Sequence, residues 1–283
     1  MAFKKIGVVG CGLMGRGIAE VSAKSGYSVV VSEINKELLG KGLDAIGKSL
    51  SKAVEKGKIS DAEKQAALGK IQGTVDMKDL RDCELIVEAA VENLELKKKI
   101  FGELDNICPP GTILSTNTSC LSVMDVAAVT RRAEKVLGCH FFNPVPVMKL
   151  LELVKTIATS KETLDAAIEW GKSLGKTTIV APDRPGFIVN RAYLPYMVEA
   201  FEMYESGVAS KEDIDTGIQL GLNYPMGPLT LADLAGLDTI LFVLDAIYAE
   251  TKSPKFVAPV LLRKMVTAGL LGRKSGKGFY DYK

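Results

Sequence analysis

A glycine-rich motif near the N-terminus constrains the fold of this chain more than any other feature. Gly10-Cys-Gly12-Leu-Met-Gly15 directly follows a short β-branched run, residues 6–9, and opens a segment with helical periodicity, residues 14–25. This arrangement is typical of dinucleotide-binding folds. The first glycine permits a tight turn, the second lets the backbone approach a pyrophosphate, and the third lets helix and strand pack closely. Amide groups at the helix N-terminus then bind the anion.

An acidic residue favours NAD as the dinucleotide. Glu33 stands at the end of the second expected strand, about 20 residues after the motif, where an acid accepts hydrogen bonds from the ribose hydroxyls. Its charge also repels the 2′-phosphate of NADP. FAD uses the same glycine motif, so the motif alone does not separate NAD from FAD. The residues expected to bind NAD from this part of the chain are Gly10, Gly12, Leu13, Met14, Gly15 and Glu33.

The order of apolar runs predicts an α/β fold of the Rossmann type, with a doubly wound, mostly parallel sheet. Short continuous apolar runs alternate with longer helical patterns, as expected when helices cover both faces of a parallel sheet. The expected strands are residues 6–9, 29–32, 85–87, 113–115 and 136–138. A lysine-rich insertion, residues 36–70, has helical periodicity and predicts a pair of antiparallel helices.

The pattern changes after the turn-rich segment Pro182-Asp-Arg-Pro-Gly186, which we interpret as a domain boundary. We expect a NAD-binding domain at residues 1–183 and an all-helical domain at residues 187–283. Helices are expected near residues 187–204, 211–220 and 229–249. The first of these is apolar over much of its surface, which favours a subunit interface and a homodimer over a monomer with a large core.

Composition excludes several classes of protein. The net charge is +2, which argues against a general nucleic-acid or membrane binder. The five cysteines are never in a Cys-x-x-Cys pair, and with one histidine in the chain we expect no metal site. The cysteines indicate buried, reduced thiols in a cytoplasmic protein. No apolar run is long enough for a membrane span.

The single histidine is a candidate acid/base residue. His140 follows an expected strand, and ligands of such folds bind outside the carboxyl ends of the strands. Glu152 lies in the apolar run Leu150-Leu-Glu-Leu-Val154, where a buried acid is costly unless it is paired. If the two side chains meet, Glu152 fixes the tautomer of His140 and stabilises the imidazolium. A structural histidine is the alternative.

Five motifs, in the same order along the chain, resemble the L-3-hydroxyacyl-CoA dehydrogenases, and most closely the short bacterial 3-hydroxybutyryl-CoA dehydrogenases. They are Gly10-Cys-Gly-Leu-Met-Gly15, Asn117-Thr-Ser119, His140-Phe-Phe-Asn-Pro-Val-Pro-Val-Met-Lys149, Pro185-Gly-Phe-Ile-Val-Asn-Arg191 and Gly272-Arg-Lys-Ser-Gly-Lys-Gly-Phe-Tyr280. The chain departs from the family at Cys120, where serine is frequent, and at Glu33, where aspartate is frequent.

The resemblance implies an NAD-dependent oxidoreductase that interconverts (S)-3-hydroxyacyl-CoA, in particular 3-hydroxybutyryl-CoA, and 3-ketoacyl-CoA. It assigns acid/base catalysis to His140 with Glu152, and substrate contacts to Ser119 and Asn190. Positions that match contacts to the nicotinamide half of NAD are Glu92, Lys97, Ser119, Asn143 and Lys274.

A lysine-rich helix face offers a site for the coenzyme A part of the substrate. Lys48, Lys52 and Lys56 recur every four residues and therefore share a helix face, beside Ser49. From spacing alone, a solvated surface helix is the better interpretation. The resemblance reverses this, because the family contacts CoA at positions that match Ser49 and Lys56.

Three other functions compete with this interpretation. Tyr248-Ala-Glu-Thr-Lys252 has the spacing of short-chain dehydrogenases but lies in the helical C-terminal part. The β-hydroxyacid dehydrogenases have a similar layout but depend on a catalytic lysine. A non-catalytic NAD-binding sensor or structural relative is the alternative from another class, and we expect such a protein to have lost the histidine–glutamate pair.

Overall fold

The computed structural model describes residues 3–282. The chain divides into two compact units, Met1–Arg184 and Pro185–Lys283. The division falls within the turn-rich segment at residues 182–186, where proline and glycine interrupt regular structure.

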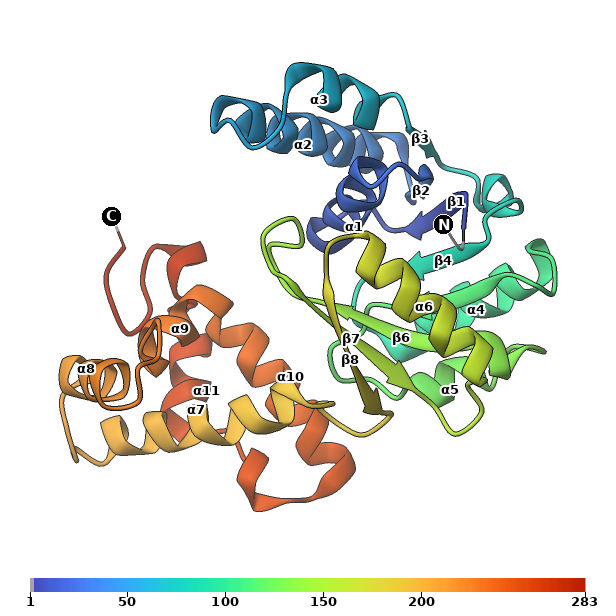
Figure 1. Ribbon diagram of the computed structural model, residues 1–283. Helices are drawn as coiled ribbons and strands as arrows, with labels where there is room; N and C mark the ends of the chain where they lie inside the picture. Colours follow the sequence, from blue (N-terminus) through green and yellow to red (C-terminus); the bar gives the residue numbers. More distant parts are fainter. Residues whose placement is uncertain (1–2, 283) are drawn as a thin grey trace. The chain divides into compact units, whose positions relative to one another are not determined.

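The first unit is built on one eight-stranded sheet (Figure 1). Its strands are β1 Lys5–Val9, β2 Ser28–Ser32, β3 Ile71–Thr74, β4 Leu85–Glu88, β5 Ile113–Thr116, β6 Val136–Phe141, β7 Leu150–Lys155 and β8 Thr177–Pro182. Their order is β3-β2-β1-β4-β5-β6-β7-β8. All neighbours are parallel except β6 and β7, which pair antiparallel. The predicted Rossmann-type, mostly parallel sheet is therefore confirmed, and three strands are added to the five expected.

Helices cover both faces of this sheet (Figure 1). The helices of the first unit are α1 Leu13–Lys24, α2 Lys36–Glu55, α3 Asp61–Leu68, α4 Leu94–Ile107, α5 Val123–Ala127 and α6 Lys161–Ser173. One face packs on α1 and α6 and the other on α4 and α5. The expected helix pair of the insertion is confirmed as α2 and α3, which lie over α1.

Side-chain caps explain where the helices of the insertion begin. The Asn35 side chain accepts a hydrogen bond from the amide of Leu38 at the start of α2. Ser60 and Glu63 form a reciprocal capping box at the start of α3. Such caps satisfy amide groups that have no partner within the helix.

Within residues 185–282, the second unit has no strand beyond two isolated β-bridges, Gly272–Lys277 and Lys277–Asp281. Its α-helices are α7 Val189–Glu205, α8 Lys211–Gly221, α9 Pro228–Ala235, α10 Leu237–Thr251 and α11 Val260–Thr267. The single helix expected over residues 229–249 is wrong, because Gly236 interrupts it with a φ of +97° and separates α9 from α10. A positive φ of this kind is readily adopted by glycine and ends a helix.

None of the helices within residues 3–282 combines the length and the low polarity that a membrane-spanning helix needs.

Candidate functional site

The glycine-rich loop after β1 has the geometry that a pyrophosphate requires. Gly10 has a φ of +94°, and a Cβ added there would lie 2.7 Å from the carbonyl oxygen of Ala89. A Cβ on Gly15 would lie 1.8 Å from the carbonyl oxygen of Gly10, so helix and loop approach more closely than any side chain permits. A Cβ on Gly12 would meet nothing within 4 Å. Gly15 therefore lets α1 pack against the loop, and Gly12 leaves open space beside the backbone.

The N-terminus of α1 supplies donors for an anion. Gly12 is the N-cap of α1 and provides no side-chain cap, so the first amide groups of this helix have no partner within it. No acidic residue lies in the first turn of α1, where it would neutralise the positive end of the helix dipole. This positive end therefore stays available to an anion beside Gly12. These residues fit the diphosphate of a dinucleotide.

Glu33 lies beside this loop, as expected. Its Oε2 accepts a hydrogen bond from the amide of Cys11 at 2.8 Å, and its Oε1 accepts one from the amide of Ile34 at 2.7 Å. The end of β2 thus holds a carboxylate next to the glycine turn. A ribose bound with its diphosphate at α1 would meet this carboxylate, whose charge disfavours a 2′-phosphate.

The predicted acid/base pair is in contact. His140 Nδ1 lies 2.7 Å from Glu152 Oε2, and both side chains are buried. The contact follows from strand pairing, because His140 and Glu152 are directly opposite each other in the antiparallel β6–β7 ladder. Side chains of directly opposed residues lie on the same face of a sheet. The Phe142 ring also contacts the imidazole, at 4.5 Å between centroids.

The other face of the same two strands is apolar. Phe141, next to His140, packs edge-on against Trp170 of α6 with 5.8 Å between ring centroids. Leu151, next to Glu152, contacts Gly171 of the same helix, where an added Cβ would lie 2.9 Å from the leucine. Alternation along the strands therefore directs the polar pair away from α6.

The polar segment after β5 is tied to the ends of two neighbouring strands. The Asn117 side chain accepts a hydrogen bond from the amide of Phe141 in β6 at 2.9 Å. The amide of Ser119 donates to Glu92 Oε1 at 2.8 Å, and the Thr118 hydroxyl donates to the same oxygen. Ser119 is therefore held in a loop between the ends of β4 and β6.

Two residues that the sequence analysis did not single out complete this region. Glu88, the last residue of β4, is fully buried and forms an ion pair with Lys97 of α4 at 2.8 Å. Thr116, at the end of β5, donates its hydroxyl to Glu88 Oε2 at 2.7 Å. An acidic residue that ends an apolar strand, as in Leu85-Ile-Val-Glu88, was the sequence feature that could have revealed this site.

Three further residues were expected to contact NAD or substrate. Asn143 is exposed in the loop between β6 and β7. Asn190 lies in the first turn of α7, and Lys274 pairs with Asp238 within the second unit. Their expected roles stay predictions.

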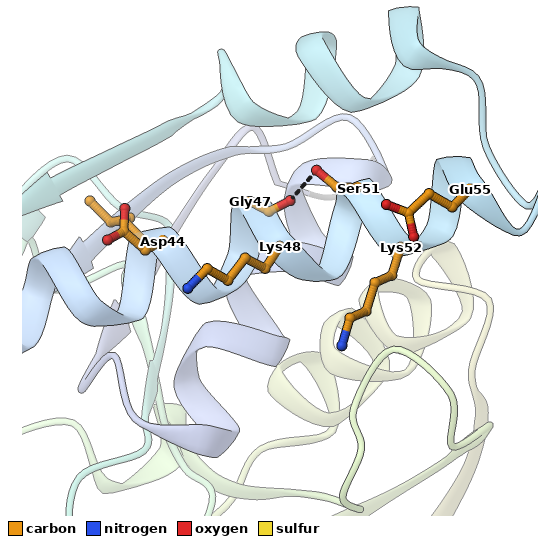
Figure 2. Close-up of a pocket in the computed structure, with 7 residues that line it drawn as sticks. Asp44, Gly47, Lys48, Ser51, Lys52 and Glu55 are labelled. Carbon is orange, nitrogen blue, oxygen red and sulfur yellow. Dashed lines mark hydrogen bonds between the residues drawn. The ribbon is translucent and has the colours of Figure 1, made fainter.

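The lysine-rich face of α2 borders a shallow pocket of about 490 Å³ (Figure 2). Lys48 and Lys52 extend from the same side of the helix, as expected from their spacing. Lys56 is the C-cap residue just beyond the helix and does not line the pocket. Ser49 is likewise outside it and lies near the Glu20 carboxyl of α1. The structure therefore groups Lys48 with Lys52 and places Ser49 toward α1.

Comparison with known proteins identifies relatives over nearly the entire chain. The family model for the NAD-binding domain of 3-hydroxyacyl-CoA dehydrogenase matches residues 5–184, and the model for the C-terminal domain of 3-hydroxyacyl-CoA dehydrogenase matches residues 186–282. A 3-hydroxybutyryl-CoA dehydrogenase of Mycobacterium tuberculosis is 46% identical and covers 99% of both chains. One of Clostridioides difficile is 45% identical, with 98% of this chain and 99% of the relative covered.

Solved structures agree with the sequence relatives. The crystal structure of M. tuberculosis FadB2 has a TM-score of 0.98 at 46% identity, with 100% of each chain covered. The crystal structure of (S)-3-hydroxybutyryl-CoA dehydrogenase PaaH1 from Ralstonia eutropha has a TM-score of 0.95 at 44% identity, with 99% of each chain covered.

Proposed function

Because the chain belongs to the 3-hydroxyacyl-CoA dehydrogenase family, an NAD-binding family of oxidoreductases, we propose that it interconverts (S)-3-hydroxyacyl-CoA and 3-ketoacyl-CoA. The proposed substrate pair is 3-hydroxybutyryl-CoA and acetoacetyl-CoA, the chemistry named for relatives at 45–46% identity. The observation that carries the proposal is the buried contact between His140 and Glu152 near the carboxyl end of the sheet.

In the proposed reaction, NAD held by the N-terminus of α1 and by Glu33 would supply the acceptor for the hydride on C3 of the hydroxyacyl thioester. The protein's own residues transfer the proton. Since Nδ1 of His140 faces the Glu152 carboxylate, we assign it as the donor to Glu152, and Nε2 as the atom that takes the hydroxyl proton. The Glu152 carboxylate stabilises the resulting imidazolium, and in the reverse direction Nε2 returns the proton to the oxygen on C3.

The remaining polar residues are proposed to orient the two ligands. The α1 N-terminus and Glu33 hold the diphosphate and the ribose, as their geometry favours. Ser119 and Asn190 are assigned to the substrate oxygen and the thioester, which raises the rate by orientation. Asn143 and Lys274 are assigned to the nicotinamide half of NAD. The basic face of α2 is assigned to the phosphates of coenzyme A.

We also propose a homodimer formed through the helical C-terminal domain. Large apolar side chains are exposed on this unit, among them Leu220, Leu222, Tyr224, Phe242 and Val260. Large apolar side chains that are this exposed gain free energy when a partner covers them. A second copy of the chain is the proposed partner, and cytoplasmic residence stays part of the proposal.

The test is the consumption of NADH with acetoacetyl-CoA, followed by absorbance, with NADPH and a longer 3-ketoacyl-CoA measured in parallel. We expect rapid oxidation of NADH with the four-carbon ester and much slower oxidation of NADPH. Measurable NADH binding without turnover of any acyl-CoA would overturn the enzyme proposal and favour the NAD-binding sensor.

A further inference from the structure

The loop after β5, residues 117–122, is held at its first end by two polar contacts. The Asn117 side chain accepts a hydrogen bond from the amide of Phe141, and the amide of Ser119 donates to Glu92. Ser119 lies between these contacts and the start of α5. The place of its hydroxyl therefore also depends on what holds the start of α5.

A carboxylate from the end of the first unit holds the start of this helix. Asp183 Oδ2 accepts a hydrogen bond from the amide of Met124 at 2.7 Å, and its Oδ1 accepts one from the amide of Val123 at 3.1 Å. The first amides of a helix have no partner within it. The local cap, Ser122, accepts from the amide of Asp125. The first three amides of α5 are thus all paired, two of them by Asp183.

The short length of α5 makes this distant acceptor important. A helix of five residues is not stable by itself in water. Apolar packing holds α5 against the sheet, since Val123 is buried and a Cβ on Gly138 of β6 would lie 3.2 Å from it. Apolar burial has no direction, however, whereas two hydrogen bonds to one carboxylate fix where the first turn lies.

Asp183 is itself attached to the sheet. It directly follows β8, whose last residue, Pro182, pairs with Lys155 at the end of β7. The amide of Asp183 then donates to the carbonyl oxygen of Lys155 at 2.9 Å. Its carboxylate is therefore a fixed point on the edge of the sheet and not the tip of a free chain.

We infer that Asp183 is a positioning residue for Ser119. Glu92 holds the loop at Ser119, and Asp183 holds the helix into which the loop runs, so the segment between them is fixed at both ends. Asp183 acts through the backbone of α5 and not by contact with the substrate. The inference rests on the proposed function, which assigns Ser119 to the substrate.

Two substitutions of Asp183 should lower the rate. Asp183→Asn replaces one carboxylate oxygen with an NH₂ group, so one amide of α5 loses its acceptor. We expect kcat/KM for acetoacetyl-CoA to fall about tenfold, since misplacing a substrate-positioning group by about 1 Å can cost 10²-fold. Asp183→Glu keeps the charge but shifts the carboxylate by one methylene, and a similar loss is expected.

The matched control is Asp125→Asn, which makes the same chemical change at an exposed acid in the first turn of the same helix. Its kcat/KM should stay within about twofold of the wild type, as is usual for surface substitutions. Thermal unfolding of each variant establishes that it is folded before rates are compared.

A double-mutant cycle with Ser119→Ala separates positioning from general stability. If Asp183 acts by placing the Ser119 hydroxyl, Asp183→Asn should change kcat/KM of the Ser119→Ala variant by less than about twofold. Independent contributions of the two residues predict that their losses multiply. Multiplied losses would overturn the inference.

Amide hydrogen exchange of the ligand-free protein tests the anchor independently of the proposed reaction. Asp183→Asn should speed exchange in peptides from residues 117–122, because the loop loses its attachment at α5. Peptides from α2 should exchange as in the wild type. Unchanged exchange of residues 117–122 in the folded variant would show that Asp183 caps α5 without holding the loop, and would also overturn the inference.

If Asp183→Asn does not fold, the cycle and the exchange measurement are made with Asp183→Glu, which keeps the charge at the start of α5. A wild type that does not turn over acetoacetyl-CoA would refute the proposed function, whereas the exchange of residues 117–122 would still decide whether Asp183 holds the Ser119 loop.

Discussion

At the scale of single residues, the candidate chemistry depends on one strand register. His140 and Glu152 are twelve positions apart in the sequence and directly opposite in the β6–β7 ladder. A slip of one residue in β7 would turn Glu152 toward α6, onto the face where Phe141 packs on Trp170. The apolar contacts of Leu151 and Leu153 on that face oppose the slip, since they would be lost with it.

Substitution of the histidine should separate catalysis from binding. His140→Ala removes the proposed proton acceptor, and we expect kcat to fall by roughly 10²- to 10⁴-fold, the usual contribution of an acid/base residue. The dissociation constant for NADH should stay unchanged. Steady-state kinetics and an NADH titration measure the two quantities, with Glu169→Gln, an exposed site on α6, as a control for unspecific effects. Joint loss of turnover and NADH binding would identify His140 as structural.

The buried acid of α1 should make stability depend on pH. Burial raises the pKa of Glu20, against the hydrogen bond from Ser49 and the charges of Lys24 and Arg16. A carboxyl whose pKa is higher in the folded than in the unfolded state favours folding at low pH, and this contribution is lost as the pH rises through the folded pKa. Glu20→Gln removes this titration.

We therefore expect Glu20→Gln to be more stable than the wild type at pH 7, with a gain that vanishes below 4.5, the ordinary pKa of a glutamate carboxyl in the unfolded chain. Urea unfolding at pH 7 and at pH 4 measures the difference. A variant that is less stable at pH 7 would mean that the contacts of the charged carboxylate with Ser49 and the nearby cations outweigh its desolvation.

At the scale of elements, two buried aspartates hold the helices of the second unit together. The Asp215 carboxylate in α8 accepts hydrogen bonds from the amides of Leu229 and Thr230 and so caps α9 from outside. Asp233 in α9 accepts from the amides of Phe279 and Tyr280. A Cβ on Gly278 would lie 2.0 Å from Asp233 Oδ1, which explains the glycine before Phe-Tyr in the C-terminal motif.

The basic face of α2 should contribute to the affinity for the CoA ester. Reversal of charge in a Lys52→Glu, Lys56→Glu double variant should raise KM for the CoA ester about five- to tenfold, because each exposed ion pair is worth up to about 1 kcal/mol. KM for NADH should stay unchanged. The effect should shrink at high ionic strength, since salt screens exposed charges. A Lys70→Glu, Lys78→Glu double variant, at two exposed sites outside α2, serves as the charge-matched control. An unchanged KM at low salt would mean that α2 is a solvated surface helix that does not bind the CoA ester.

At the scale of the whole molecule, the two units differ in what they bury. In the first unit, the sheet face that packs on α1 and α6 carries a continuous apolar core that includes Val8, Val31, Val87 and Trp170. In the second unit, Leu220 is 81% exposed and Leu222 58% exposed, near the end of α8. Apolar side chains this exposed gain free energy when a partner covers them.

Light scattering on the purified protein should therefore give twice the mass of one chain. Substitution of both leucines, Leu220→Glu with Leu222→Glu, should shift the equilibrium toward the monomer. The matched control is Ile157→Glu in the first unit, where the isoleucine is 98% exposed, and this variant should stay dimeric. A wild type that is monomeric at every concentration would refute the dimer, and a dimeric double variant would place the interface elsewhere.

The sequence by itself determined the features that depend on local backbone and short-range periodicity. The glycine turn before α1, Glu33 after β2 and the capped helices of the insertion all follow from conformational demands of a few neighbouring residues. The mostly parallel sheet followed from the alternation of apolar runs with helical patterns. Even here a local feature was overlooked, because Gly236 breaks the helix expected over residues 229–249.

Only the tertiary structure decided which charged side chains, distant in the sequence, contact each other. The sequence indicated that Glu152 needs a partner, but the antiparallel pairing of β7 with β6 brings its carboxylate to His140. Lys97 matched a cofactor contact in the sequence, yet the fold places its ammonium between Glu88 and Glu92. The physical reason is that strand register and burial arise from long-range packing, and no local pattern encodes how many partners a charged group finds once water is excluded.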